Sequence, residues 1–295
     1  MRPRWPRRWN VSRSADSRAG AHLRTRVEEL RVVFEFYQLA AAIYLAAAVT
    51  AALGFTLPSR RLSRAAVVGL ALGVVAHTVA FWQLHKGEGT PPLTDLAYVV
   101  PFVVWLLTLF YLLLLIRVRL IGLAVVVAPL AFIGTFAEFL GAPAPASGAQ
   151  PASPIWSHVH VLLASAGLAL LAVAGSAGAL YLAHHRTIKS KRPSAIRLPL
   201  PSLEALDQVN VLSLVVGFLL LSLGVVTGVL WTQAVDGRLW PATMHANATL
   251  VAWLVLAVLI AARFGAGQGA RQSALASMGA FILMLLAVVG VGMLA

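Results

Sequence analysis

Eight runs of apolar residues divide this chain, and each is long enough to cross a lipid bilayer as a helix, which needs about 20 mostly apolar residues. None of the runs shows the alternation of apolar and polar residues that is typical of a barrel strand. We therefore predict an all-α, polytopic integral membrane helical bundle with about eight transmembrane helices. The predicted spans are Val33–Leu57, Ala65–Leu84, Tyr98–Ile116, Leu120–Leu140, Val159–Ala183, Val209–Leu230, Met244–Ala262 and Ser277–Leu294.

Composition agrees with a membrane protein, because 60% of the residues are hydrophobic and only 11% are charged. Residues 141–154 (GAPAPASGAQPASP) form an uncharged linker that separates four spans from the next four. Residues 184–201 are basic and contain prolines, so we interpret His184 and His185 as part of a solvated loop. The sequence LPSLEALDQVN that ends this region predicts a short amphipathic helix before the sixth span.

The basic residues indicate the orientation of the bundle. If the first loop is cytoplasmic, the cytoplasmic loops hold twelve Lys and Arg residues and the opposite loops hold only Lys86 and Arg238. This asymmetry predicts a multi-pass protein of the bacterial cytoplasmic membrane with both termini outside. Residues 1–31 contradict the rule with nine arginines, so we separate them, as a disordered arm or a spurious upstream extension, from a transmembrane domain at 32–295.

Several classes of function lack support in the sequence. The absence of cysteine excludes a C-x-x-C-H haem attachment site, a thiol-exchange motif and a disulfide. There is also no paired-carboxylate site, G-x-S-x-G elbow or P-loop, so we assign no catalytic residue. The net charge of +13 comes from the tail and from the topology, and no nucleic-acid motif accompanies it. Lipid is the expected surrounding partner, and nucleic acid is not expected.

Three histidines, His77, His160 and His245, fall in the same half of the predicted membrane. His77 lies several residues inside the second span, where a polar side chain is costly; a structural hydrogen bond is the alternative to a functional role. His158 and His160 lie about 200° apart around a helix, so they cannot both face one ligand unless the helix starts between them. His160 is the better ligand candidate, with an interfacial anchor as the alternative. His245 opens the seventh span, where a helix cap or a surface residue is the alternative.

The loop before the seventh span adds aromatic and cationic groups to these imidazoles. Trp231 and Trp240 stand at the two helix ends, and Arg238 lies between them. Interfacial tryptophans also occur in ordinary aromatic belts. Flat aromatic surfaces, a cation for a propionate and nearby imidazoles nevertheless suit non-covalently bound haem at the outer face. We predict His160 as the axial ligand to the metal and His245 as a second one, with His77 as a further candidate for the cofactor site.

The chain resembles the cytochrome c assembly family, and especially its HemX-like branch, over nearly everything after the basic tail. The similarity is carried by AHTVAFWQLHKGEGTPPLTDL, WSHVHVLLASAGLALL, GVLWTQAVDGRLWPATMHANATLVAWLVLAVLIAAR and GQGARQSALASMGAF. The resemblance implies haem handling on the outer face, a haem-presenting loop of the form W-x-W-D-P-K-E and an axial histidine at the start of the fifth span. It also implies cytochrome c assembly or haem-synthesis proteins as membrane partners. Trp240, Trp253 and His160 fall at the corresponding positions.

The sequence also departs from the family pattern. Residues 241–246 read PATMHA, so the second tryptophan and the acidic and lysine positions are replaced, with His245 near the lysine position. The family's haem-ligating members have a histidine late in the seventh span and another beyond the last span. Here those places hold Ala261 and Ala262 and the chain end at Ala295. We therefore expect an accessory haem-binding member rather than a complete haem lyase. The alternatives are a ligand-free scaffold that regulates haem synthesis or assembly, and a small-solute transporter.

The predicted orientation can be tested with the cysteine-free chain. A cysteine introduced by Ser147→Cys should react with an impermeant thiol reagent added outside the cell, whereas one introduced by Ser190→Cys should not, because the charge asymmetry places the two positions on opposite sides. The reverse labelling pattern would overturn the orientation.

Overall fold

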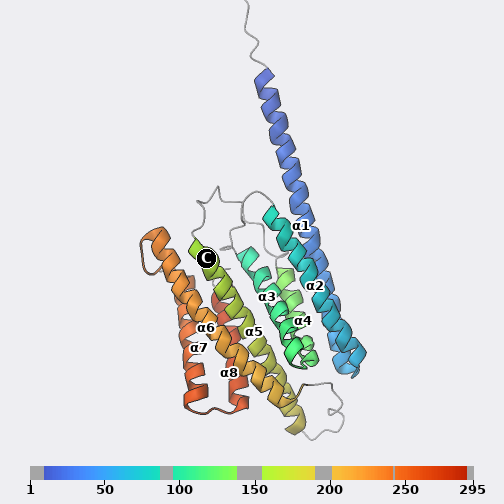
Figure 1. Ribbon diagram of the computed structural model, residues 1–295, viewed down its shortest axis with the longest axis vertical. Coiled ribbons are helices and arrows are strands. Elements are labelled where there is room, and N and C mark those ends of the chain that lie inside the picture. The colour runs from blue at the N-terminus through green and yellow to red at the C-terminus, as the bar shows by residue number, and fades with distance from the viewer. Residues whose placement is uncertain (1–9, 87–95, 138–154, 190–200, 242, 291–295) are drawn as a thin grey trace, which may run out of the picture.

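The computed structural model describes residues 10–86, 96–137, 155–189, 201–241 and 243–290, and the fold is a bundle of helices (Figure 1). A 3₁₀ turn (Ile121–Leu123) precedes α4, and a π-helical segment (Leu286–Gly290) continues α8. The described residues form eight α-helices: α1 (Asn10–Thr56), α2 (Arg60–Lys86), α3 (Leu96–Arg117), α4 (Ala124–Ala137), α5 (Ile155–Lys189), α6 (Leu203–Asp236), α7 (Met244–Gly265) and α8 (Ala270–Leu285).

Helix α5 is the central element of the bundle. It packs against α3 and α4 on one side and against α6 and α8 on the other (Figure 1). Of the 18 residues in its most apolar window, 78% are buried, a larger share than in any other long helix described. Its sequence explains this position, because ASAGLALLAVAGSAGAL is rich in small residues that allow neighbouring helices to approach from several directions.

The α5–α6 pair is the most extensive helix contact in the described structure. A Cβ atom added at Gly167 of α5 would lie 2.6 Å from Leu221 Cγ and 2.9 Å from the Gly217 carbonyl oxygen of α6. Both distances are shorter than van der Waals contact, so the two backbones approach as closely as glycine permits. This close approach fixes the relative position of the two helices that carry His160 and Trp231.

A buried polar network holds α5, α6 and α8 together. The Asn210 side-chain amide donates to the Ala174 carbonyl oxygen at 2.7 Å and to Ser277 Oγ at 2.6 Å. Ser273 Oγ donates to Asn210 Oδ1 at 3.2 Å. Asn210, Ser273 and Ser277 are all at most 1% exposed, so these bonds replace contacts with water that the interior does not offer.

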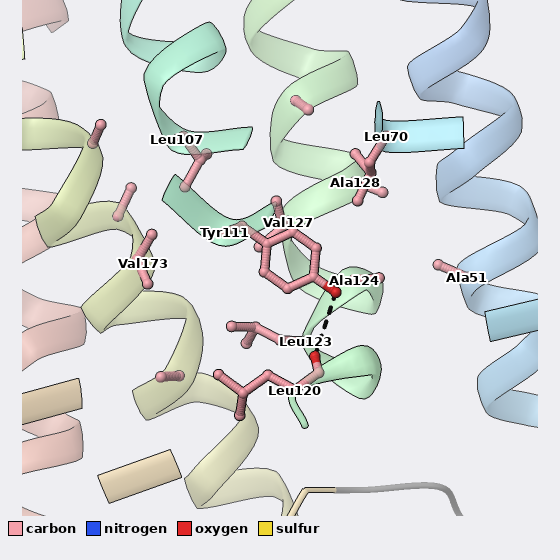
Figure 2. Close-up of a cluster of buried hydrophobic side chains, with 14 of the residues drawn as sticks. Ala51, Leu70, Leu107, Tyr111, Leu120, Leu123, Ala124, Val127, Ala128 and Val173 are labelled. Carbon is pink, nitrogen blue, oxygen red and sulfur yellow. Dashed lines mark hydrogen bonds between the residues drawn. The ribbon is translucent and has the colours of Figure 1, made fainter. Parts of the chain in front are cut away.

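A hydrophobic core lies where α3 and α4 meet α1, α2 and α5, and Figure 2 shows part of it. The Tyr111 hydroxyl donates to the carbonyl oxygens of Leu120 and Ile121, each at 3.3 Å. This fixes the turn between α3 and α4 against the apolar side chains around it. The neighbours labelled in Figure 2 include Ala51, Leu70, Leu107, Leu123, Val127 and Val173.

The outer surface of the bundle is apolar, as a lipid-facing surface must be. Large hydrophobic side chains are more than half exposed on several helices, for example Val75 on α2, Leu219 on α6 and Val258 on α7. Soluble proteins rarely expose contiguous apolar surface on this scale. Seven described helices are long and apolar enough to span a membrane, and Ile121–Ala137 forms a shorter apolar helix. The prediction of a polytopic helical membrane protein is confirmed.

The structure corrects two details of the predicted elements. The short amphipathic helix predicted before the sixth span is not separate, because α6 runs without interruption from Leu203 to Asp236. Ser202 caps it, accepting a hydrogen bond from the Ala205 amide at 3.2 Å, and no proline or glycine follows until Gly217. His184 and His185 lie in the last turns of α5, so their assignment to a solvated loop is wrong. The linker at 141–154 lies outside the described residues.

The close contact of α5 and α6 predicts a sharp difference between two glycines. Gly167→Ala should lower the stability of the purified protein in detergent by about 1–3 kcal/mol, the usual cost of overpacking a well-filled interior. Gly279→Ala, on α8, is the control, because nothing lies within 4 Å of the added Cβ. It should be neutral or stabilising, by up to about 1 kcal/mol from improved helix propensity. Unfolding curves that move equally for both variants would contradict close α5–α6 packing.

Candidate haem site

The candidate site lies at the end of the bundle where α5 begins, α6 ends and α7 begins (Figure 1). His160 lies in the second turn of α5, Trp231 in the last two turns of α6, and His245 in the first turn of α7. Three segments that are distant in sequence thus bring the predicted imidazole and indole side chains to one end of the molecule.

His160 is held by a hydrogen bond across the α5–α6 interface. Its Nδ1 lies 2.7 Å from the Gly224 carbonyl oxygen. A carbonyl oxygen only accepts, so Nδ1 must carry the proton and donate it. In the neutral ring Nε2 then keeps its lone pair, the state that a metal-ligating imidazole requires. A backbone carbonyl that receives the other ring N–H is also the usual way in which proteins orient a histidine ligand.

One glycine of α6 makes room for this ring, and a second lets α5 approach beside it. A Cβ atom added at Gly228 would lie 3.0 Å from both Cε1 and Nδ1 of His160, and one added at Gly224 would lie 3.4 Å from Ala164. Gly224, Gly228 and Trp231 follow one another at spacings of four and three residues, so they share one face of α6. The Trp231 and His160 rings have centroids 5.8 Å apart and planes inclined by 37°.

His245 lies in the first turn of α7, at the same end of the bundle as His160. Its side chain is exposed, and no hydrogen bond of its ring is found within the described part of the chain. It is not the cap of its helix, because Thr243 takes that place and accepts from the Ala246 amide at 3.2 Å. The structure thus places at one end of the bundle two imidazoles that are 85 residues apart in the sequence.

The loop between α6 and α7 folds back onto α7. Gly237 ends α6 in the left-handed conformation, with φ of 66°, and reverses the chain before Arg238. Trp240 Nε1 donates to Asn247 Oδ1 at 3.0 Å, which fixes the second predicted indole against the start of α7. Arg238 is exposed, and no carboxylate within the described residues pairs with it.

Trp253 has a different role from the other two tryptophans. It lies within α7, where its Nε1 donates to Ser222 Oγ at 3.0 Å and its ring stacks on Phe218 at 5.7 Å. Both partners belong to α6, so Trp253 attaches α7 to α6. This contact also positions His245, which lies about two turns earlier on α7.

The structure places His77 in a different part of the bundle. It is fully buried on α2, which packs mainly against α1, α3 and α4. Its ring stacks on Phe81 at 4.9 Å and meets the edge of Tyr37 at 5.3 Å and of Tyr44 at 6.1 Å. Neither ring nitrogen has a hydrogen-bond partner within the described residues. His77 is therefore not brought together with His160 and His245.

Sequence reasoning missed Gly224, Gly228 and Asn247, which position the side chains that it named. The glycines could have been found from their register, because they align with Trp231 on one helical face. Asn247 could not, because its bond to Trp240 depends on the loop conformation. His158 has only a local partner, since its Nδ1 lies 3.4 Å from Ser157 Oγ, whereas His160 bonds across to α6.

Comparison with known proteins places the chain in a family. Residues 93–295 match the family described as Cytochrome C assembly protein, and this region includes α3 to α8. Among curated proteins, the cytochrome c biogenesis protein CcsA of Prochlorococcus marinus (strain MIT 9303) is 31% identical over 91 residues, which are 31% of this chain and 29% of that protein. CcsA of Synechococcus sp. (strain WH7803) is 33% identical over 92 residues, 31% and 28% of the two chains.

The similarity to these curated relatives thus covers less than a third of their length. Among solved structures, a chain described as cytochrome c haem lyase CcmF matches with a TM-score of 0.61 and 17% identity, over 90% of this chain and 50% of that one. At that identity the match supports the fold alone. The family match extends over more than half of the chain and includes every helix of the candidate site, so this protein belongs to the cytochrome c assembly protein family.

Proposed function

We propose that this protein binds haem non-covalently at the end of the bundle formed by α5, α6 and α7, on the outer face of a bacterial cytoplasmic membrane. Membership of the cytochrome c assembly family supports a haem-handling role in cytochrome c maturation. The observation that carries the proposal is the hydrogen bond from His160 Nδ1 to the Gly224 carbonyl oxygen, because it leaves Nε2 available as a ligand.

Each predicted residue has a separate task in this proposal. His160 supplies Nε2 as the axial ligand, and His245, which is exposed and is not the α7 cap, supplies a second imidazole. Trp231 and Trp240 provide aromatic walls for the porphyrin, and Arg238 pairs with a propionate. Haem would contribute the iron centre that these imidazoles hold. His77, predicted from sequence as a further candidate, is not included in this group of residues because it packs among aromatic rings on α2.

We further propose an accessory role in the HemX-like branch rather than haem ligation to an apocytochrome. The loop after Trp240 lacks the second tryptophan and the acidic and lysine positions, and Ala261 and Ala262 stand where the ligating members have a histidine. The protein would bind or shelter haem for other assembly or haem-synthesis proteins in the membrane.

The haem ligand can be tested by spectroscopy of the purified, haem-reconstituted protein. His160→Ala should shift or weaken the Soret band and reduce haem affinity by at least about tenfold, the lower range for disrupting a metal site. His158→Ala is the matched control, two residues away on the same helix end, and should leave the band unchanged. Added imidazole should partly restore the band in His160→Ala. Equal spectra for the two variants, or no haem uptake by the unaltered protein, would favour a ligand-free scaffold.

The accessory role leads to a negative expectation in cells. Expressed in bacteria that lack their own haem-ligating assembly protein, this chain should not restore covalent haem in c-type cytochromes, because the residues that present haem for ligation are replaced. Haem staining of a denaturing gel, with an authentic lyase as the positive control, gives the readout. Strong covalent staining from this chain alone would place it among the lyases and contradict the accessory role.

A further inference from the structure

A basic pocket lies between α5 and α8, at the opposite end of the bundle from the candidate haem site. It encloses a cavity of about 210 Å³ and is lined by Leu182, His185, Arg186, Lys189, Arg271 and Leu275. Three of these six side chains are permanent cations, and none is a carboxylate. His185 is held at the wall by stacking on Tyr181, with ring centroids 6.0 Å apart and planes inclined by 8°.

The cations of the basic pocket have no carboxylate partner among the residues that the structure describes. Within the described part of the chain, no ion pair involves Arg186, Lys189 or Arg271. The nearby end of α7 shows the contrast, because Arg263 donates to Asp207 Oδ2 at 3.3 Å. Three cations around one cavity repel one another, and an anion in the cavity would relieve that repulsion.

The helix dipoles explain only part of this arrangement. Arg186 and Lys189 lie in the last turn of α5, where cations are favourable. Arg271 lies in the first turn of α8, where a cation is unfavourable. That turn contains no acidic residue, and its N-cap, Gly269, offers no side-chain cap. The positive end of α8 and the Arg271 guanidinium therefore add to the positive potential of the α5 cations.

The level of the pocket in the membrane identifies the kind of anion. Helix α5 has 35 residues and is about 52 Å long, which exceeds the roughly 30 Å hydrocarbon core of a bilayer. Charged side chains are costly inside that core, so we expect the last turn of α5, with Arg186 and Lys189, and the adjoining Arg271 of α8 to lie at the headgroup level. Leu275, one turn deeper than Arg271, is 48% exposed and continues the pocket wall toward the apolar interior.

We propose that the basic pocket binds the phosphate of an anionic phospholipid headgroup, while Leu275 contacts the beginning of an acyl chain. Basic pockets between transmembrane helices on the cytoplasmic side are typical sites for such headgroups. Cations line the end of the pocket nearer the membrane surface and Leu275 lines the deeper end. This arrangement suits an amphiphile better than free phosphate, which would not contact Leu275. The site is independent of the proposed haem site, because it is formed by the other end of α5 and by α8.

Native mass spectrometry of the full-length protein can test this site with phosphatidylglycerol and phosphatidylcholine of identical acyl chains. The unaltered protein should retain phosphatidylglycerol in preference to phosphatidylcholine. The triple change Arg186→Gln, Lys189→Gln and Arg271→Gln should weaken retention of phosphatidylglycerol at least about tenfold. The matched control is Arg60→Gln, Arg61→Gln and Arg64→Gln, which removes the same charge from the start of α2 and should change retention little.

Circular dichroism and gel filtration verify that the variants fold, as expected for exposed side chains. If the triple variant does not fold, Arg271→Gln alone tests the site, because it removes the pocket's cation on α8 and should also weaken retention of phosphatidylglycerol. Equal loss in the pocket and control variants would overturn the site in favour of general surface charge. Equal retention of phosphatidylcholine, or displacement by inorganic phosphate at equal concentration, would overturn the assignment to an anionic lipid.

Discussion

The contact between α5 and α6 is the constraint on which the rest of the structure depends. Its closeness follows from the glycines that face across it, because a side chain at Gly167 would collide with Leu221 and with the Gly217 backbone. Farther along the same interface, Gly224 lies against Ala164 of α5 and Gly228 leaves space for the His160 imidazole. The bond from His160 Nδ1 to the Gly224 carbonyl oxygen is thus a consequence of helix packing as much as of the histidine itself. If α5 and α6 were packed less closely, the Gly224 carbonyl oxygen would be out of reach of His160 Nδ1.

Polar groups inside the bundle fall into two kinds. Asn210 uses its amide nitrogen and its oxygen to join three helices, so its hydrogen bonds serve assembly. His160 uses one ring nitrogen to anchor itself and leaves the other available, a pattern that suits ligand binding. His77 differs from both, since its two nitrogens lack partners within the described residues and its ring packs among aromatic side chains. Burial alone therefore does not distinguish a ligand from a packing residue, but the partner of each ring nitrogen does.

Much of the fold could be predicted from sequence because the membrane limits the choices to long apolar helices. The geometry of the candidate site was harder to predict from the sequence. His160 could be preferred over His158 because it is the first of the two inside the span, and its hydrogen bond to α6 agrees with that preference. Its bond to Gly224 could not be predicted, because it joins residues 64 apart through a contact that depends on the register of two helices. The continuity of α6 was missed for a simpler reason: charged residues near Asp207 resemble an interfacial segment, although no breaker interrupts the helix.

The departures from the expected family pattern occur in the loop and, at Ala261 and Ala262, late in α7, whereas the fold of the helices resembles that of a solved relative. Trp253 still attaches α7 to α6, and Trp240 is still fixed to the start of α7 through Asn247. Because Thr243 caps the helix, the side chain at position 245 has no part in maintaining the turn. That position can therefore change chemically without cost to the scaffold, and here it offers an imidazole at the same end of the bundle as His160. Replacement of the loop thus alters which groups are presented at this end of the bundle, while the α5–α6 contact continues to determine where they stand.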